Sequence, residues 1–140
     1  MTYKEDQLRA IFQRTSGYCH ICHKKVAFKN YGKFKARGAW EVEHSNPRAK
    51  SGTNQLNNLL PACISCNRSE GTSSTRSIRA EKGKTRAPLS LERRKIARLL
   101  NAFLGGVAGV VVGSLFGPWG RVIGLFIGAS IGHKKNPDKM

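Results

Sequence analysis

The chain has 140 residues, which allows one modest domain with extensions and leaves no room for a second large domain. Its 25 Lys and Arg against 8 Asp and Glu give a net charge of +17. Residues 1–101 hold 21 of the basic and 7 of the acidic residues, so +14 of this charge lies outside the C-terminal region. The charge favours a polyanionic partner, because each Lys or Arg that meets a phosphate releases condensed counterions. Nucleic acid, a ribosome-like partner and anionic lipid all fit this charge.

The four cysteines form two CxxC pairs: Cys19 with Cys22, and Cys63 with Cys66. In a short secreted chain they could form disulfides, but the first residues, MTYKEDQLRAIF, show no secretory signal. Reduced thiols at this spacing favour a zinc site, because two sulfurs three residues apart on a tight turn can face one ion. His20 and His23 are alternative ligands beside the first pair.

Residues 4–16 predict a short amphipathic helix, since Leu8 and Phe12 recur at helical spacing among polar residues. Gly17 then supplies a stop signal. Residues 24–34 mix aromatic and β-branched residues with lysines, which fits either a hairpin or an extended loop.

The segment WEVEH, from Trp40 to His44, alternates apolar and acidic residues. This alternation predicts a strand whose Trp40 and Val42 face the core. Acidic residues are scarce in this chain, so two of them within three positions stand out. Glu41 and Glu43, beside His44, indicate either a bound cation or local salt bridges to the many lysines.

Residues 45–57 are rich in Ser, Gly, Asn and Pro and predict a long surface loop, in which Arg48 and Lys50 could contact phosphates. Residues 64–69, which follow Cys63 and include Cys66, predict a helical turn. Gly71 fits the C-terminal cap of that turn.

Residues 72–86 contain Ser, Thr, Arg and Lys with little apolar content, and predict a basic connector that can become ordered on DNA. Ser90 then fits the N-cap of an amphipathic helix that extends to about residue 100. Arginines and lysines crowd the polar face of this helix.

Residues 102–132 are apolar and nearly uncharged. Their glycines recur every fourth residue in two sets: Gly105, Gly109, Gly113 and Gly117, then Gly120, Gly124, Gly128 and Gly132. Each set lies on one helix face, where small residues let backbones approach closely. We therefore expect a glycine-zipper hairpin with its turn at residues 117–121. About sixteen residues rise about 24 Å, short of a hydrocarbon core of about 30 Å. Membrane association, self-association and disorder remain the alternatives.

Glu43-His44, the later run NNLLPACISCNRSEG and the two CxxC pairs together resemble the HNH endonuclease family in its His-Asn-Asn variant. The resemblance covers roughly residues 15–75. It implies an α+β fold with a small zinc-stapled ββα-metal core and flanking helices, to which the glycine-rich helical hairpin is added at the C-terminus. We expect four segments: a nuclease domain (1–76), a basic linker with an amphipathic helix (77–101), the apolar hairpin (102–132) and a basic tail (133–140).

The resemblance assigns His44 as the general base that takes a proton from the attacking water, a role suited to histidine. It assigns Glu43 and Asn67 as ligands of a catalytic Mg²⁺ or Mn²⁺. It assigns Asn58 to the catalytic centre as the brace of the loop that orients His44. It implies a structural Zn²⁺ on four ligands: Cys19, Cys22, Cys63 and Cys66. Because strand neighbours point to opposite faces, Glu43 and His44 reach one ion only if the strand ends or twists there, or if Glu41 assists.

The implied function is divalent-metal-dependent hydrolysis of DNA phosphodiester bonds in the cytoplasm, without a small-molecule cofactor. We expect DNA contacts from five basic residues: Arg48, Lys50, Arg68, Arg76 and Arg79. Two alternatives remain, a zinc-stapled DNA-binding module that does not cut and a membrane-active nuclease toxin. Attachment to a membrane or self-association would use residues 102–132.

Overall fold

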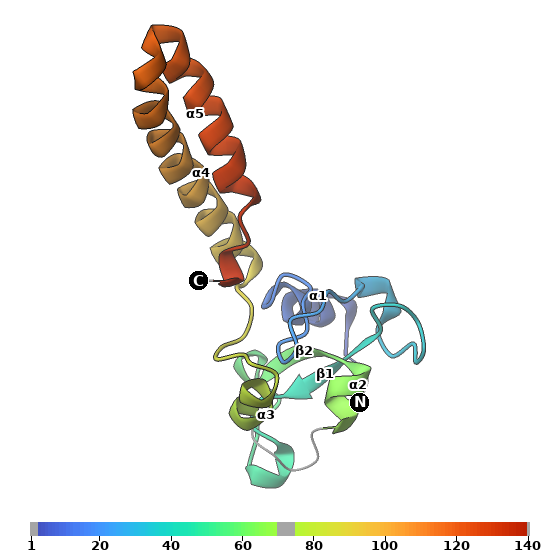
Figure 1. Ribbon diagram of the computed structural model, residues 1–140. Coiled ribbons are helices and arrows are strands. Elements are labelled where there is room, and N and C mark those ends of the chain that lie inside the picture. The colour runs from blue at the N-terminus through green and yellow to red at the C-terminus, as the bar shows by residue number, and fades with distance from the viewer. Residues whose placement is uncertain (1–2, 70–74, 140) are drawn as a thin grey trace. The chain divides into compact units, whose positions relative to one another are not determined.

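The computed structural model describes residues 3–69 and 75–139, which form two compact units, Met1–Leu91 and Glu92–Met140 (Figure 1). The first unit contains three helices and two strands: α1 (Glu5–Gln13), β1 (Trp40–His44), β2 (Leu59–Cys63), α2 (Ile64–Ser69) and α3 (Thr75–Glu81). The helices that form the second unit are α4 (Leu91–Gly113) and α5 (Gly117–Lys134). Short 3₁₀ turns complete the chain at Phe28–Asn30, Arg48–Lys50, Leu56–Asn58, Ser114–Phe116 and Pro137–Lys139.

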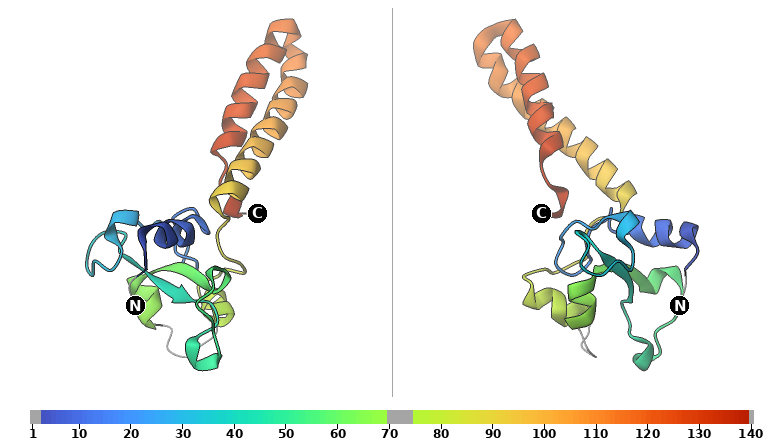
Figure 2. Two further views of the ribbon diagram at one scale, coloured as in Figure 1. Left: turned by 180° about the vertical axis from the view of Figure 1, so that it is seen from behind. Right: turned by 90° about the vertical axis from the view of Figure 1, so that its right-hand side faces the viewer.

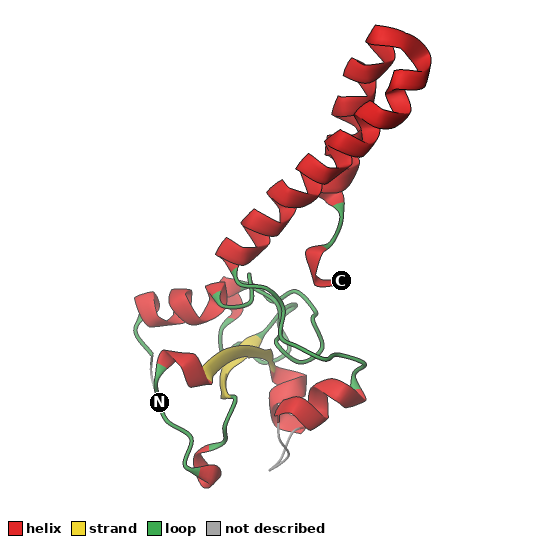
Figure 3. Cartoon of the chain, turned by 90° about the vertical axis from the view of Figure 1, so that its left-hand side faces the viewer, coloured by secondary structure: helices red, strands yellow, loops and turns green. Residues whose placement is uncertain are grey.

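The two strands pair antiparallel, and α2 follows β2 directly (Figure 3). The register pairs Trp40 with Cys63 and His44 with Leu59. This strand–strand–helix order, with flanking helices and a C-terminal helical hairpin, confirms the predicted α+β fold class. Gly71, the predicted cap of α2, lies outside the described residues.

Trp40 is the centre of the core in the first unit, where it is fully buried. Aromatic rings surround its indole: the ring centroids of Tyr31, Phe12 and Phe28 lie 5.0, 5.3 and 6.3 Å away. Aliphatic residues complete the core, among them Ile11, Ile21, Leu59 and Ile78. The predicted strand WEVEH therefore turns its tryptophan inward, as the alternation required.

Ile78 brings α3 into this core. Part of the stretch that we expected to be a connector is therefore a helix, because its single large apolar residue has a buried place to occupy. Residues 72–74 of that stretch lie outside the described part of the chain. The domain boundary that we expected after residue 76 falls inside α3, and the first compact unit continues to Leu91.

The segment between α1 and β1 forms tight turns. α1 ends at Gln13, and Gly17 has a φ of +74°, where an added Cβ would also overlap the Phe12 ring. The backbone N–H of Cys19 donates to the Lys24 carbonyl at 2.8 Å and closes the first cysteine turn. Residues 24–34, which fitted a hairpin or a loop, contain a 3₁₀ turn flanked by isolated bridges.

In the second unit, α4 and α5 run antiparallel and side by side (Figure 2). Glycine faces glycine across their contact: a Cβ added at Gly109 would overlap the carbonyl oxygen of Gly124. The reversal is the 3₁₀ turn Ser114–Phe116, so the expected turn at residues 117–121 is displaced toward the N-terminus. Pro118 explains this, because proline is favoured in the first turn of a helix, and here it lies in the first turn of α5.

Candidate functional site

The two CxxC pairs meet in one cluster. The sulfurs of the four cysteines all lie within 4.8 Å of one another, and those of Cys22 and Cys63 are 3.8 Å apart. Four sulfurs at about 2.3 Å from a tetrahedral zinc ion lie about 3.8 Å from each other, so the cluster fits this ion. The cysteines are free thiols, not disulfides. The backbone N–H of His20 donates to the Pro61 carbonyl at 2.9 Å and joins the first pair to β2.

The pKa values of the Cys63 and Cys66 thiols are shifted in opposite directions. Hydrogen bonds from the thiols of Cys19 and Cys22 hold the pKa of the Cys63 thiol well below its ordinary value. Burial, followed by the hydrogen bond with Cys63, raises the pKa of the Cys66 thiol to about 12. A divalent cation would replace the shared protons, because thiolates are the form in which cysteine binds metal.

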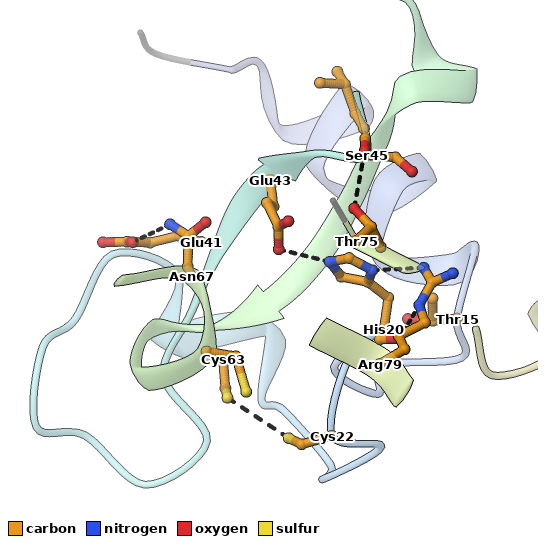
Figure 4. A network of polar contacts seen from close by, with 12 residues as sticks. Thr15, His20, Cys22, Glu41, Glu43, Ser45, Cys63, Asn67, Thr75 and Arg79 are labelled. Atoms are coloured by element: carbon orange, nitrogen blue, oxygen red, sulfur yellow. Dashed lines mark hydrogen bonds and ion pairs between the residues drawn. The ribbon is translucent and has the colours of Figure 1, made fainter. Parts of the chain in front are cut away.

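Glu43 points into a buried polar network (Figure 4). Its Oε2 lies 2.6 Å from Nε2 of His20, and Glu43 is 7% exposed. On the other side of the ring, Arg79 donates from Nη2 to Nδ1 of His20 at 2.7 Å. Since arginine can only donate, Nδ1 is the acceptor and Nε2 carries the proton that goes to Glu43. Both ring nitrogens of His20 are thus engaged, and the residues placed to hold a metal ion are the four cysteines.

The second carboxylate of β1, Glu41, contacts Asn67 of α2. The Asn67 side chain donates from Nδ2 to Oε2 of Glu41 at 2.7 Å. Arg68 also approaches Glu41, with an N–O distance of 3.6 Å, while its guanidinium lies 4.6 Å from the Phe34 ring centroid. An amide that donates its N–H₂ to a carboxylate does not use its oxygen in that bond, so Oδ1 of Asn67 can still act as an acceptor.

His44 and Asn67 line the same cavity, of about 470 Å³. Its walls come from the N-terminal segment, the turn before β1, β1 itself, the loop after it and α2: Tyr3, Tyr31, Gly32, Glu41, Val42, His44, Arg48 and Asn67. Burial, with smaller contributions from the charges of Tyr3 and Glu41, raises the pKa of Tyr31, so its phenol stays protonated and can donate a hydrogen bond. The cavity thus combines a histidine, a carboxylate, an amide and a guanidinium.

His44 is held by the loop that follows β1. Its Nε2 lies 2.9 Å from Oδ1 of Asn54, and Arg48 donates from Nη2 to the same oxygen at 2.7 Å. The Nε atom of Arg48 is 3.4 Å from Nε2 of His44, a longer contact. The sequence indicated no special role for Asn54, because the loop is rich in polar residues and nothing in it marks one asparagine.

Asn58 braces this loop from its far end. Its Oδ1 accepts from the backbone N–H of Asn46 at 2.7 Å, and its Nδ2 donates to the carbonyls of Asn46 and Thr53 at 3.0 and 2.8 Å. These bonds fix Asn46, two residues after His44, and Thr53, next to Asn54. Asn58 therefore acts on His44 through the loop, without a direct side-chain bond between the two in the described contacts.

The five basic residues that we expected to contact DNA differ in their exposure to solvent. Arg48, Lys50, Arg68 and Arg76 are exposed. Arg79 is half-buried, with its Nε donating to the His20 carbonyl at 2.8 Å in addition to the ring contact. The structure thus separates Arg79 from the other four.

Comparison with known proteins gives one family. Residues 19–73 match the family described as HNH endonuclease. This segment is an HNH domain. The match includes both CxxC pairs, β1, the loop with Asn54 and Asn58, β2 and α2, while Tyr3 and Arg79 lie outside it. No curated protein and no solved structure matches the chain significantly.

Proposed function

We propose that the HNH domain is an endonuclease that hydrolyses DNA phosphodiester bonds with the help of a divalent cation. The observation that carries this proposal is the shared cavity of His44, Asn67 and Arg48. It supplies a base, an oxygen ligand for a cation and a positive charge for a phosphate. The net charge of the chain, +17, suits a polyanionic substrate.

In this proposal His44 is the general base. Nε2 of His44 has two contacts, Oδ1 of Asn54 at 2.9 Å and the donor Nε of Arg48 at 3.4 Å. We propose the tautomer that favours the shorter contact, in which Nε2 donates to Asn54 and the unprotonated nitrogen is Nδ1. That atom takes the proton from the water that attacks the phosphorus. Asn58 keeps the ring in place through the loop and does not itself react.

The proposed ligands of the catalytic ion are Asn67, which lines the cavity, and Glu43, which is buried against His20 and is not among the residues that line the cavity. Oxygen ligands restrict this ion to a hard cation such as Mg²⁺ or Mn²⁺. When bound, such an ion neutralises charge on the phosphate oxygens. Each proposed ligand has a neighbour that orients it: His20 holds Oε2 of Glu43, and Glu41 holds Nδ2 of Asn67. In the view of Figure 4, Glu43 lies between the Glu41–Asn67 pair and His20. Ligating carboxylates and amides commonly have such supporting hydrogen bonds.

The zinc-binding role of the cysteine cluster is structural in this proposal. Four thiolate ligands close the coordination sphere, and a closed sphere leaves no position for substrate. The ion would link the turn that contains Cys19 and Cys22 to the start of α2, the helix that carries Asn67.

The four exposed basic residues, Arg48, Lys50, Arg68 and Arg76, are proposed to contact DNA phosphates. Arg79 is proposed to act differently, by fixing the tautomer of His20 and through it the orientation of Glu43. Phosphate contacts position a nuclease on DNA without selecting a sequence.

The test is the nicking of supercoiled plasmid by the full-length protein with Mg²⁺, with Mn²⁺ or with a chelator. His44→Ala should lower the nicking rate at least about 100-fold, the usual contribution of a general base. DNA retention in a gel shift should remain, since this side chain is not a phosphate contact. His133→Ala, an exposed histidine of the second unit, is the matched control and should cut normally.

Two results would contradict the proposal. Nicking by His44→Ala at the normal rate would exclude His44 as the base. DNA binding by the unaltered protein without nicking under every metal condition would favour a DNA-binding module that does not cut.

A further inference from the structure

The hairpin of α4 and α5 exposes its large apolar side chains. The segment Leu91–Lys134 is long and apolar enough to cross a membrane, and its most apolar 18-residue window has a mean hydropathy of 2.0 with only 17% of that window buried. Between Leu99 and Ile131 the sequence holds one charged residue, Arg121. An exposed apolar surface of this extent marks contact with another apolar phase or molecule.

The hairpin cannot cover this surface itself, because its helices meet through their backbones. Cβ atoms added at Gly105 or Gly113 would overlap the carbonyl oxygens of Gly128 or Gly120. Such a contact hides glycines and leaves the larger side chains outside. A groove of about 860 Å³ runs along the contact. Glycines of both helices line it together with six large apolar side chains: Leu104, Val112, Phe116, Ile123, Ile127 and Ile131.

The distribution of the exposed apolar residues indicates what kind of partner covers the hairpin. Exposed large apolar residues stand at successive positions, Val111 and Val112 on α4 and Leu125 to Ile127 on α5. Successive helical residues point about 100° apart, so these side chains surround the helices. A second copy of the chain would cover one face, whereas lipid chains cover all of them. We propose that residues 99–131 insert into a lipid bilayer as a two-helix hairpin that spans it.

The dimensions and the charges define the orientation. From Leu99 to Gly113, just before the chain reverses, α4 rises about 22 Å. This is shorter than a hydrocarbon core of about 30 Å, and local thinning of the bilayer and snorkelling of flanking side chains accommodate the difference. Basic residues follow at the open end of the hairpin, on both helices: Arg93, Lys95 and Arg98 on α4, then Lys134 and Lys135 around the end of α5. These residues lie among anionic headgroups, on the cytoplasmic side by the positive-inside tendency.

The turn of the hairpin reaches the opposite interface. Trp119 is 80% exposed near the start of α5, and Arg121 follows it two residues later. Tryptophan prefers the headgroup level, and a long arginine side chain can extend to it from a helix end. The first unit, which contains the HNH domain and is joined to α4 at Leu91, is therefore held at the leaflet whose headgroups contact the basic residues. The insertion does not depend on nuclease activity, so His44→Ala should insert equally.

The test uses the full-length protein, added to vesicles of phosphatidylcholine and phosphatidylglycerol. The protein should float with the vesicles and remain bound after an alkaline wash. Trp119 fluorescence should be quenched by iodide trapped inside the vesicles and not by iodide outside. Trp40, which is 0% exposed, contributes a constant background, and Trp119→Phe should remove the quenching.

A pair of variants tests whether lipid contacts the exposed side chains. Phe126→Asp places a charge in the middle of α5 and should lower vesicle partition about 100-fold. Thr85→Asp, an exposed position of the first unit, makes the same change in net charge and should partition normally.

Three results would overturn the proposal. The first is quenching of Trp119 by iodide outside the vesicles, which means that the hairpin lies on the surface. The second is a discrete oligomer that stays out of vesicles, which means that copies of the chain cover each other. The third is equal partition of Phe126→Asp and Thr85→Asp.

Discussion

The two tryptophans show how differently the two units of this chain are built. Trp40 is 0% exposed within a shell of aromatic rings, whereas Trp119 is 80% exposed beside a helix turn. The first unit, which contains the HNH domain, folds by burying its own side chains and by bringing four thiols together. The hairpin folds by bringing two backbones together and leaves its large apolar side chains exposed. Under the proposed insertion, lipid covers these side chains, whereas the first unit covers its own.

Loss of a zinc ligand should have the largest effect, because it should unfold the first unit and leave the second unit folded. Cys66→Ser removes one of four thiolates, and a structural zinc site contributes about 10–16 kcal/mol to the folding of small zinc domains. We expect the first unit to unfold and all nicking to be lost, while the hairpin keeps its helices. Near-ultraviolet circular dichroism reports the first unit through Trp40, and far-ultraviolet dichroism reports the remaining helix.

Ser65→Ala is the matched control, because it removes the hydroxyl 3.3 Å from the Cys63 sulfur and leaves all four sulfurs in place. A strong chelator should reproduce the effect of Cys66→Ser, and added Zn²⁺ should reverse it. Normal folding of Cys66→Ser after metal removal would show that the cysteine cluster is not needed for the fold.

The next largest effect should distinguish the two carboxylates of β1. Glu43→Gln keeps an oxygen for His20 but removes the charge at the proposed ion site, so nicking should fall at least about 100-fold and should need more Mg²⁺. Glu41→Gln disturbs the partner of Asn67 and the ion pair with Arg68, and should reduce nicking about 10-fold. Rates measured over a range of Mg²⁺ concentrations separate the two. A larger loss for Glu41→Gln would assign the ligand role to Glu41.

A smaller effect is expected from a side chain placed between the two helices of the hairpin. Gly109→Leu would put a side chain where the carbonyl oxygen of Gly124 lies, and overpacking of this kind costs about 1–3 kcal/mol. Thermal unfolding of the helical signal in micelles should show the loss, with the HNH domain unaffected. Ala108→Leu adds a similar side chain on an exposed position and should leave the hairpin stable. Equal melting of the two variants would exclude the glycine contact.

The sequence predicted those parts of the HNH domain that short patterns determine. The alternation in WEVEH predicted β1 with Trp40 inward, the region after Pro61 predicted α2, and the cysteine spacing predicted a four-thiol cluster. In each case the signal lies within a few residues. The two apolar helices of the hairpin could be predicted for the same reason, since their glycines recur every fourth residue.

The remaining features depend on contacts between segments that are distant in the sequence. The pairing of Glu43 with His20 requires the path of β1 past the first cysteine turn, and Arg79 reaches His20 only because Ile78 docks α3 on the core. The alternation of strand residues correctly indicated that Glu43 and His44 diverge. It could not show which neighbour each side chain would meet.

The smallest expected effect separates Arg76 from Arg79, two arginines of one helix. Arg76→Ala removes an exposed charge, so it should weaken DNA binding modestly and reduce the slope of log K against log salt by about 1. Arg79→Ala instead removes the donor to Nδ1 of His20. It should leave that salt slope unchanged while raising the Mg²⁺ requirement of nicking, because the orientation of Glu43 depends on the tautomer of His20. DNA binding measured at several salt concentrations, together with nicking over a range of Mg²⁺, distinguishes the two. A salt slope that falls equally for both variants would place Arg79 at the phosphates after all.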